Sequence, residues 1–315
     1  MKILIADPVH PVFIKILSDN NFEIVEGKDW TIEKILSEIN NFDGIVVKSR
    51  FNIDKIFLDA ATHLKFIARN GVGLEHIDCD YCERKNIKII TAPEGSRDAV
   101  GEHAIGMLLT LLHKINIADQ QVRQGQWIRE ANRGTELKGK IVGIIGFGNM
   151  GSAFAKKLQG FDVNILAYDK YKSGFGNEYV KEVQPEEIFA EADILSLHIP
   201  LSEETLHLVN KEYINNFKKE FYLINTSRGK IVKTSDLAEA IKTGKIKGAC
   251  LDVLEYEKQS FENLFDKEKL NSDLQYLLNS EKVIFTPHIA GGTYESDEKI
   301  GRVLAEKVIS VGRWQ

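Results

Sequence analysis

Arg228, Glu257 and His288 are the side chains of this 315-residue chain whose types suggest chemistry, and each lies in a polar run that follows an apolar one. An arginine can hold a carboxylate or a carbonyl with two parallel hydrogen bonds. A histidine can take the proton of an alcohol while hydride leaves the same carbon, and a carboxylate at its far ring nitrogen favours the imidazolium. Together they indicate hydride transfer coupled to proton transfer; surface ion pairs or a core histidine are the alternatives.

A glycine-rich turn, Gly146-Phe147-Gly148-Asn149-Met150-Gly151, joins a predicted strand at Ile141–Ile145 to a predicted helix at Met150–Gln159. The first glycine permits a tight turn, the second lets the backbone approach a diphosphate, and the third allows close packing of helix and strand. The helix N-terminus offers N–H groups to the anion. The turn therefore predicts a dinucleotide site, with a Rossmann-like fold that binds nothing as the alternative.

Asp169 follows the next predicted strand, Val163–Tyr168. A carboxylate at this place accepts hydrogen bonds from ribose hydroxyls and repels a 2′-phosphate, which favours NAD over NADP. Lys170 follows directly and would weaken that preference.

A second glycine cluster, Asn70-Gly71-Val72-Gly73, follows the predicted strand Phe66–Ala68. Successive backbone N–H groups in such a turn can form an anion-binding nest. A tight turn without a ligand is the alternative.

Short apolar runs alternate with amphipathic segments along the first ninety residues, which predicts crossover connections and an α/β fold. The predicted strands are Lys2–Ala6, Phe22–Val25, Gly44–Val47, Phe66–Ala68 and Ile87–Ile90, and the helices include Val12–Ser18, Thr31–Glu38 and Ile53–Ala60.

A second alternating series begins at Lys140 and predicts a doubly wound sheet of six strands. Ligands bind beyond the carboxyl ends of such strands, so the polar runs with Arg228, Glu257 and His288 could converge on a cofactor. The predicted strands are Ile141–Ile145, Val163–Tyr168, Asp193–His198, Phe221–Asn225, Ile246–Asp252 and Val283–Phe285, and the helices include Met150–Gln159, Pro185–Ala190, Glu212–Lys218 and Ser235–Thr243.

Three further segments are distinctive. Residues 98–119 are apolar nearly all round, which predicts a helix buried between domains or subunits, or an ordinary core helix. Tyr256–Ser280 is polar without a clear period and is expected to be a long surface loop with a short helix. Tyr294–Val311 is a predicted helix that we expect to pack onto the first domain.

Composition limits the class of protein. Length suggests two domains, and 43% hydrophobic with 28% charged residues is ordinary for a globular chain, which excludes disorder, collagen and a disulfide scaffold. A net charge of −5 argues against nucleic acid as a partner. No N-terminal run suits a signal peptide and none reaches the ~18 apolar residues of a membrane span, so we expect a cytoplasmic protein without a membrane partner.

The three cysteines, Cys79, Cys82 and Cys250, are sparse and odd in number, which indicates free thiols in a reducing compartment. Cys79 and Cys82 form a C-x-x-C pair, but no second pair of Cys or His lies nearby to complete four zinc ligands. We therefore expect no metal site.

In content and order these motifs resemble the D-2-hydroxyacid dehydrogenase family, and within it most closely the D-3-phosphoglycerate dehydrogenases. The resemblance spans nearly the whole chain. It is carried by Asn70–Asp78, Gly146–Gly151, Asn225–Gly229, Leu251–Glu257 and Thr286–Gly291, with smaller matches at Pro93–Gly95, Gly101–Ala104 and His198–Leu201.

The resemblance implies two Rossmann-like domains. Residues 1–94 plus 293–315 would form a flavodoxin-like substrate domain, and residues 95–292 a doubly wound NAD-binding domain. His288 would be the acid/base, Glu257 its partner, and Arg228 the group that binds the substrate carboxylate, together with backbone N–H groups of Val72 and Gly73.

The implied cofactor is NAD, and the implied assembly is a homodimer formed through the segment from about Asp98. Residues expected to line the nicotinamide and ribose are Thr205, Thr226, Asp252 and Gly291, and His198, Pro200 and Ser227 are expected to contact the cofactor as well, beside Gly146–Gly151 and Asp169.

Two departures from the family pattern affect Glu257. Lys258 follows it where many relatives have proline, and the connection Tyr256–Ser280 is longer than usual. Glu255 is therefore kept as the alternative partner of His288. The chain resembles only the catalytic part of phosphoglycerate dehydrogenases, so we expect no regulatory domain and no feedback by serine through one.

A phosphorylated substrate needs further cations. Lys48 and Arg69 match substrate positions of phosphoglycerate dehydrogenases, Arg50 lies close by, and Arg97, Arg129 and Arg133 are weaker candidates; solvated surface charges are the alternative. The first expectation is oxidation of 3-phosphoglycerate, which opens serine synthesis. The second is reduction of hydroxypyruvate or glyoxylate. A non-enzymatic NAD-sensing protein is the third, and the intact set of Arg228, Glu257 and His288 argues against it.

Overall fold

The computed structural model describes residues 1–257 and 271–312, and the chain divides into two compact units. Unit 1 comprises Met1–Ser96 with Gly292–Gln315, and unit 2 comprises Arg97–Gly291. The boundaries expected from the sequence, after residue 94 and before residue 293, fall within two residues of these. Each unit has its own parallel sheet and its own core.

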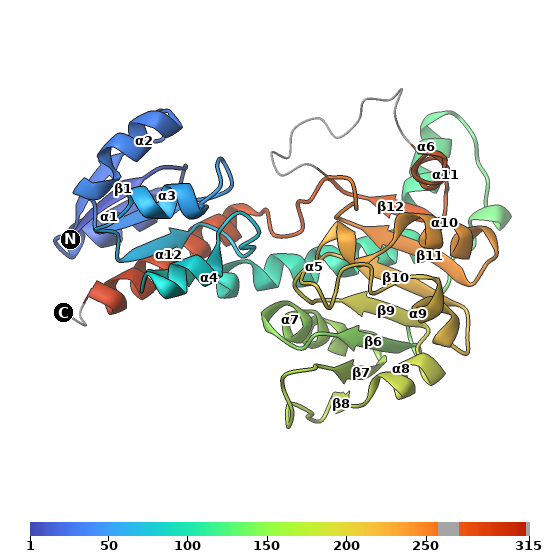
Figure 1. The fold of residues 1–315 in the computed structure, drawn as a ribbon. Coiled ribbons are helices and arrows are strands. Elements are labelled where there is room, and N and C mark those ends of the chain that lie inside the picture. Colours follow the sequence, from blue (N-terminus) through green and yellow to red (C-terminus); the bar gives the residue numbers. More distant parts are fainter. Residues whose placement is uncertain (258–270, 313–315) are drawn as a thin grey trace. The chain divides into compact units, whose positions relative to one another are not determined.

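Unit 1 contains a five-stranded parallel sheet with the order β2-β1-β3-β4-β5, which is the flavodoxin-like order expected (Figure 1). Its central strand β3 is apolar and buried at every residue, as in a parallel sheet whose two faces are covered by helices. The elements are β1 (Lys2–Ile5), α1 (Pro11–Asp19), β2 (Glu23–Glu26), α2 (Ile32–Glu38), β3 (Gly44–Val47), α3 (Lys55–Ala60), β4 (Phe66–Arg69), α4 (Cys79–Arg84), β5 (Lys88–Thr91) and α12 (Tyr294–Gly312).

The C-terminal helix α12 packs beside α1 within unit 1. Leu304 and Val308 of α12 share a core with Phe13 and Leu17 of α1, and all four are fully buried. Segments nearly 300 residues apart in the sequence therefore build one hydrophobic core.

Unit 2 contains a seven-stranded parallel sheet with the order β12-β11-β10-β9-β6-β7-β8 (Figure 1). All six predicted strands are present. The prediction of only six was wrong, because β8 has three residues and buries only Val180. The elements are β6 (Ile141–Ile145), α7 (Asn149–Leu158), β7 (Asn164–Tyr168), β8 (Val180–Glu182), α8 (Pro185–Glu191), β9 (Ile194–Leu197), α9 (Lys211–Asn216), β10 (Phe221–Asn225), α10 (Thr234–Lys242), β11 (Ile246–Leu251), α11 (Ser272–Leu278) and β12 (Val283–Phe285).

The strand order of this sheet reverses at β6: β7 and β8 are added on one side of it, and β9 to β12 on the other. Strand β7 pairs with one side of β6, and β9 pairs with the other side. Such a switch point is where open α/β sheets bind ligands, beyond the carboxyl ends of the strands. The glycine-rich turn follows β6 directly, so it lies at this point.

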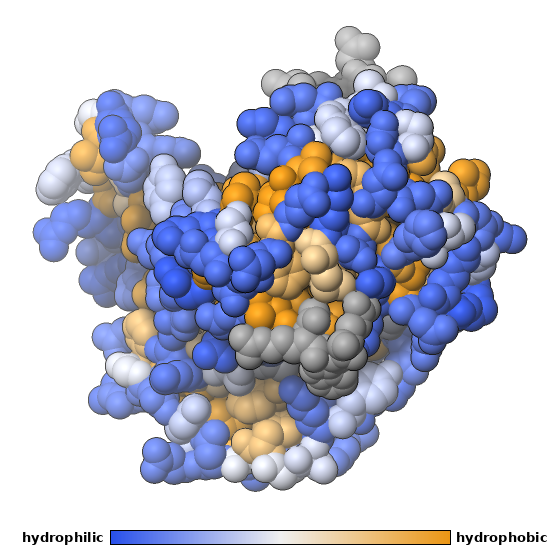
Figure 2. All heavy atoms as spheres, turned by 90° about the vertical axis from the view of Figure 1, so that its left-hand side faces the viewer, coloured by the Kyte–Doolittle hydropathy of each residue, from blue (hydrophilic) through white to orange (hydrophobic). Residues whose placement is uncertain are grey.

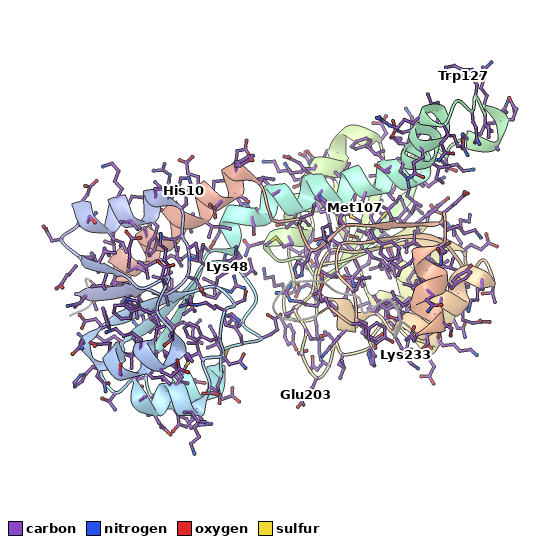
Figure 3. The ribbon with its side chains drawn as sticks, turned by 90° about the horizontal axis from the view of Figure 1, so that it is seen from above. His10, Lys48, Met107, Trp127, Glu203 and Lys233 are labelled. Carbon is purple, nitrogen blue, oxygen red and sulfur yellow. The ribbon has the colours of Figure 1, made fainter. Side chains whose placement is uncertain are left out.

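The apolar segment 98–119 is not one helix. Helix α5 (Pro93–Leu112) ends where Lys114 takes a left-handed φ of +53°, and α6 (Ile115–Arg123) follows. Within the chain α5 is a core helix, since Leu108, Leu111 and Leu112 are buried. In contrast, α6 buries no residue. Residues 113–133, which include α6, are called the arm below, and Trp127 lies at its tip (Figure 3).

The outer surface is mixed. The face in Figure 2 is mostly hydrophilic, with apolar side chains between the polar ones. Within residues 1–257 and 271–312, no helix is both long and apolar enough to cross a bilayer. Of the predicted loop Tyr256–Ser280, α11 is the expected short helix, and residues 258–270 lie outside the described residues.

Candidate active site

The three candidate catalytic side chains follow adjacent strands of unit 2. Strand β11 lies between β10 and β12, and both pairings are parallel. Arg228 follows β10, Glu257 follows β11, and His288 follows β12. Because parallel strands end at one edge of a sheet, these residues share the edge at which the glycine-rich turn lies.

The side chains of His288 and Glu257 lie next to each other. The distance between His288 Nδ1 and Glu257 Oε1 is 3.2 Å, and the two side chains are 28% and 18% exposed. Glu257 also accepts a hydrogen bond from the N–H of Leu254 at 3.4 Å. A carboxylate on Nδ1 orients the ring, so Nε2 is the nitrogen that can exchange a proton with a ligand.

The alternative partner Glu255 is engaged elsewhere. One oxygen lies 2.8 Å from His207 Nε2, and the other accepts the N–H of Thr234 at the start of α10, also at 2.8 Å. The carboxylate of Glu255 therefore connects the loop after β9 to the start of α10. Glu257, two residues further along the chain, faces His288.

The backbone of His288 adopts a left-handed φ of +54°, a conformation that residues with a Cβ rarely take. Its N–H donates to the carbonyl oxygen of Asp252 at 2.8 Å and to that of Thr286 at 3.0 Å. Such outliers persist where the surrounding contacts over-determine them, often at functional sites.

The carboxylate of Asp252 holds the whole loop that carries His288. It is 1% exposed, and it accepts the Thr286 hydroxyl at 2.6 Å and the N–H groups of Ile289 and Ala290 at 2.9 Å each. His103 Nε2 lies 3.0 Å from the same hydroxyl oxygen. Since Thr286 gives its only proton to Asp252, we assign the proton of this second contact to His103 Nε2.

Sequence reasoning gave Thr286 and His103 no role of their own. Both occur in motifs that resemble the family, but His103 is 183 residues away from its partner Thr286. No local pattern could have joined them, because the contact depends on α5 lying against the end of β12.

Arg228 lies in a loop whose path is set by its neighbours. The buried Asn225 accepts the N–H of Ser227 and donates to the carbonyl oxygen of Arg228. A Cβ on Gly229 would lie 1.9 Å from the carbonyl oxygen of Leu254, so only glycine lets the loops after β10 and β11 pack this closely. The Arg228 Nη1 donates to the carbonyl of Ser227 at 2.7 Å.

The glycine-rich turn fits a dinucleotide. Gly146 has φ +92°, and a Cβ there would lie 2.4 Å from the carbonyl oxygen of His198. A Cβ on Gly151 would lie 2.0 Å from the carbonyl oxygen of Gly146, whereas the space beside Gly148 is open. Helix α7 begins after Gly148 without a side-chain cap, so its first N–H groups face this open side, as diphosphate binding requires.

Asp169 ties the loop after β7 to the glycine-rich turn. One oxygen accepts the N–H of Phe147 at 2.7 Å, and the other accepts those of Tyr171 and Lys172 at 3.0 and 3.1 Å. The carboxylate is thereby fixed beside the turn, where a ribose of the dinucleotide would lie.

The other expected cofactor residues differ in their surroundings. The Thr226 hydroxyl is buried without a hydrogen-bond partner among the described residues, which fits a polar group of a ligand. The hydroxyls of Ser227 and Thr205 instead donate to the carbonyls of Leu197 and Pro200 and shape their own loops.

His198 is a structural neighbour of the turn. Its Nε2 lies 2.8 Å from the Ser196 hydroxyl, and its ring packs on Phe154 with 5.2 Å between centroids. Burial lowers the pKa of His198 to about 3, so the ring is neutral at physiological pH.

In unit 1, the turn Asn70-Gly71-Val72-Gly73 is braced by Arg69. Its Nε donates to the carbonyl of Gly73 at 2.8 Å and its Nη1 to that of Asn70 at 2.7 Å. Gly71 has φ +142°, and a Cβ there would lie 1.4 Å from Nη1 of Arg69, so the guanidinium occupies the space that the missing side chain leaves. Val72, at the tip, is 37% exposed.

The remaining candidate cations of unit 1 divide into two kinds. Lys48 is exposed at the end of β3, and its backbone N–H donates to the buried carboxylate of Asp7 (Figure 3). Arg50 is engaged, with Nε 3.3 Å from Asp7 Oδ1 and Nη1 donating to the carbonyl of Lys28. Lys48 is therefore the better candidate for a phosphate contact.

Comparison with known proteins identifies the class. The family described as "D-isomer specific 2-hydroxyacid dehydrogenase, NAD binding domain" matches residues 105–290. D-3-phosphoglycerate dehydrogenase of Archaeoglobus fulgidus is 34% identical over 315 residues, which cover 99% of this chain and 58% of the relative. The chain thus spans little more than half the length of this relative.

Two further proteins match over nearly their whole lengths. Hydroxypyruvate reductase of Thermotoga maritima is 33% identical over 309 residues, which cover 98% of this chain and 97% of the relative. The structure of D-lactate dehydrogenase from Aquifex aeolicus, complexed with NAD and lactic acid, superposes with a TM-score of 0.83 at 30% identity and covers 99% of this chain and 96% of that one. The chain belongs to the D-2-hydroxyacid dehydrogenase family, and it contains the NAD-binding domain of that family.

Proposed function

We propose that this protein is an NAD-dependent dehydrogenase that interconverts a D-2-hydroxy acid and the 2-oxo acid. The observation that carries the proposal is the 3.2 Å distance between His288 Nδ1 and Glu257 Oε1 at the sheet edge that also bears the glycine-rich turn. Unit 2 then serves as the NAD-binding domain and unit 1 as the substrate domain.

His288 acts as the acid/base. Its Nε2 takes the proton of the C2 hydroxyl during oxidation and returns it during reduction, and Glu257 stabilises the imidazolium that forms. NAD, when bound, supplies the nicotinamide ring that accepts hydride from C2. The hydrogen bonds from the backbone to Asp252 hold the loop that positions the imidazole.

Arg228 holds the carboxylate of the substrate through its planar guanidinium. The backbone N–H groups of Val72 and Gly73 are proposed to bind the same carboxylate, and Arg69 keeps their loop in shape. Lys48 is the proposed contact for a phosphate, with Arg69 contributing positive charge.

The proposed substrate is 3-phosphoglycerate, which the protein would oxidise at the opening step of serine synthesis. Support comes from Lys48 and Arg69 and from relatives of that name, although those are longer chains. Reduction of hydroxypyruvate or glyoxylate is the second candidate, because the relative from T. maritima matches along nearly its whole length.

A panel of substrates tests these proposals. Steady-state rates are followed through the absorbance of NADH with 3-phosphoglycerate, hydroxypyruvate, glyoxylate and D-lactate. The largest kcat/KM is expected for 3-phosphoglycerate with NAD. A larger value for hydroxypyruvate or glyoxylate replaces it with the second candidate, and bound NADH without turnover of any acid supports a sensor instead.

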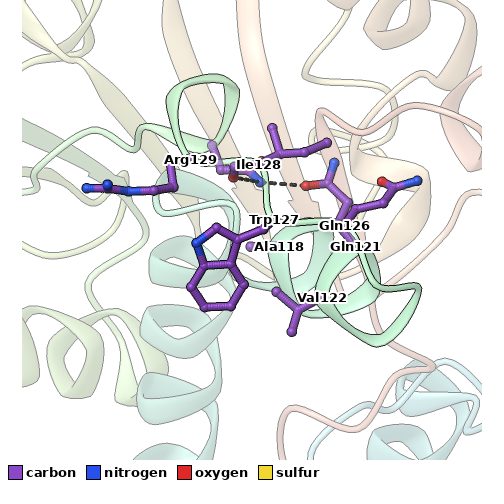
Figure 4. A pocket seen from close by; sticks show the side chains of 8 residues that line it. Ala118, Gln121, Val122, Gln126, Trp127, Ile128 and Arg129 are labelled. Atoms are coloured by element: carbon purple, nitrogen blue, oxygen red, sulfur yellow. Dashed lines mark hydrogen bonds between the residues drawn. The ribbon is translucent and has the colours of Figure 1, made fainter.

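A homodimer is proposed through the arm that follows α5. Helix α6 buries none of its residues, and Ile115, Val122 and Trp127 are 53%, 52% and 79% exposed. Val122 and Trp127 line one pocket of the arm with Ala118 and Ile128 (Figure 4). An amphipathic helix without a covered face requires a partner, and a second copy supplies the same apolar groups.

Light scattering tests the dimer. The native mass is expected to be twice the 35.6 kDa of one chain, and Val122→Asp should return it to one. Ile56→Asp, on α3 of unit 1, is the control because Ile56 is 74% exposed and lies outside the arm. A native mass of 35.6 kDa would disprove the dimer.

The proposed location is the cytoplasm. All three cysteines are thiols, as a reducing compartment favours. Burial raises the pKa of Cys82 to about 11, which keeps this thiol protonated and unreactive.

A further inference from the structure

An ion pair connects the two loops on either side of the glycine-rich turn. Lys170, in the loop after β7, lies 2.8 Å through Nζ from Oε2 of Glu204, in the loop after β9. The hydroxyl of Tyr171 donates to the same oxygen at 2.7 Å. Because β7 and β9 flank β6, the contact bridges the strand end from which the turn emerges (Figure 1).

Lys170 occupies the place where a cation favours NADP. It directly follows Asp169, whose oxygens are fixed by the N–H groups of Phe147, Tyr171 and Lys172. In dinucleotide-binding folds a basic residue near this carboxylate accommodates the 2′-phosphate. The chain thus has a cation where NADP would need one, although the family match and the carboxylate indicate NAD.

Glu204 neutralises the positive charge of Lys170. The hydrogen bond with Lys170, followed by that with Tyr171, lowers the pKa of Glu204, and the same ion pair raises the pKa of Lys170. Both groups are therefore charged at neutral pH, and their charges cancel. A 2′-phosphate would meet two carboxylates, Asp169 and Glu204, against one ammonium.

The ion pair between Lys170 and Glu204 contributes little to the stability of the fold. Lys170 and Glu204 are 55% and 53% exposed, and exposed ion pairs contribute almost nothing to the free energy of unfolding. Its effect should instead be on ligand choice, because a ligand can be rejected by placing an unmatched like charge where it binds.

We propose that Glu204 determines cofactor specificity: it holds Lys170 and Tyr171 away from a 2′-phosphate and adds its own negative charge against one. The inference rests on the proposed contact between Asp169 and the ribose. Through this arrangement the chain keeps a lysine beside Asp169 and still selects NAD.

The test is Glu204→Gln, which removes the charge but keeps an oxygen that can accept from Tyr171. Dissociation constants for NADH and NADPH are measured by fluorescence titration, without substrate. The matched control is Glu203→Gln, which removes the same charge from the neighbouring residue (Figure 3).

In Glu204→Gln the Kd for NADPH is expected to fall about five-fold or more, since one repulsive charge is removed and one ammonium is released. The Kd for NADH should change by less than about two-fold. The gain should shrink in high salt, as an exposed electrostatic effect does, and Lys170→Ala in the Glu204→Gln background should abolish it.

Two outcomes overturn the inference in different ways. The role of Glu204 is disproved, while the NAD site stands, if the ratio of the Kd for NADPH to the Kd for NADH is the same in Glu204→Gln as in the native protein. An equal change of this ratio in Glu203→Gln would disprove the role of Glu204 as well. If the native protein binds neither nucleotide, the cofactor site itself is disproved, and the inference fails with it.

Discussion

The N–H of His288 donates to the carbonyl oxygen of Asp252 at 2.8 Å, and the carboxylate of the same aspartate accepts the N–H groups of the next two residues, Ile289 and Ala290. One buried residue thus holds three successive backbone N–H groups. The left-handed φ of +54° at His288 is maintained by these contacts. The imidazole that we propose as the acid/base is therefore positioned by its backbone as well as by Glu257.

Thr286→Val should lower kcat about ten-fold while the KM for NAD changes little, because the hydroxyl between His103 and Asp252 is lost and the His288 loop loosens. Steady-state kinetics measure both values. Thr286→Ser, which keeps the hydroxyl, should restore kcat.

The control for Thr286→Val is Thr110→Val, since the Thr110 hydroxyl donates to the carbonyl of Gly106 in its own helix. Equal losses of kcat in the two variants would show that the hydrogen-bond chain has no part in positioning His288.

His288→Ala should reduce turnover by about 10²-fold or more and leave the affinity for NAD intact, as expected for a lost general acid/base. Glu257→Gln should also lower turnover, because a neutral amide stabilises the imidazolium less. Turnover and NADH titration are compared for each variant, and normal turnover in His288→Ala would remove this residue from the mechanism.

The variant Glu255→Gln distinguishes the structural role of Glu255 from the proposed catalytic role of Glu257. We expect it to lower the free energy of unfolding by about 1 kcal/mol, because the contacts to His207 and to the N–H of Thr234 weaken, and to spare turnover. Urea unfolding measures the first quantity. If Glu255→Gln slows turnover as much as Glu257→Gln does, the assignment of the partner is wrong.

Arg228→Lys should raise the KM for the acid substrate and lower kcat/KM, because an ammonium cannot form two parallel hydrogen bonds with a carboxylate. The affinity for NADH should be unchanged, which fluorescence titration checks. Unaltered kinetics with the acid would contradict the proposed contact with its carboxylate.

The stability of unit 2 should depend on the ionisation of His198. Its pKa is lowered to about 3 in the folded chain, whereas an unfolded histidine titrates near its ordinary value of about 6.5. As pH falls from about 6.5 toward 3, only the unfolded chain gains this proton, so the free energy of unfolding decreases. Above about pH 6.5 His198 is neutral in both the folded and the unfolded chain, so it no longer lowers the free energy of unfolding.

Urea unfolding followed by circular dichroism at pH 7.5, 6.0 and 5.0 measures this dependence. His198→Gln should show a smaller decrease than the native chain, and His113→Gln, at an exposed position of the arm, should show the native decrease. Equal slopes in all three proteins would rule out His198 as the cause.

Two α/β units and the order of their elements can be predicted from the sequence alone. Apolar runs such as Ile141–Ile145 and Gly44–Val47 are found as strands at the predicted bounds, because a parallel sheet covered on both faces needs uninterrupted apolar side chains. The glycine-rich turn could be predicted equally well, since a φ of +92° at Gly146 is a local requirement of the backbone. The strand β8 was missed because a three-residue edge strand has almost no pattern.

Which side chains contact one another depends on how the whole chain packs. Glu255 and Glu257 are equivalent candidates in the sequence, and the path of the loop after β11 alone directs one to His207 and the other to His288. The contacts of His103 with Thr286 and of Lys170 with Glu204 likewise join distant segments. Periodicity and turn chemistry are local properties of the chain, whereas hydrogen bonds and ion pairs depend on how strand ends and loops pack in three dimensions.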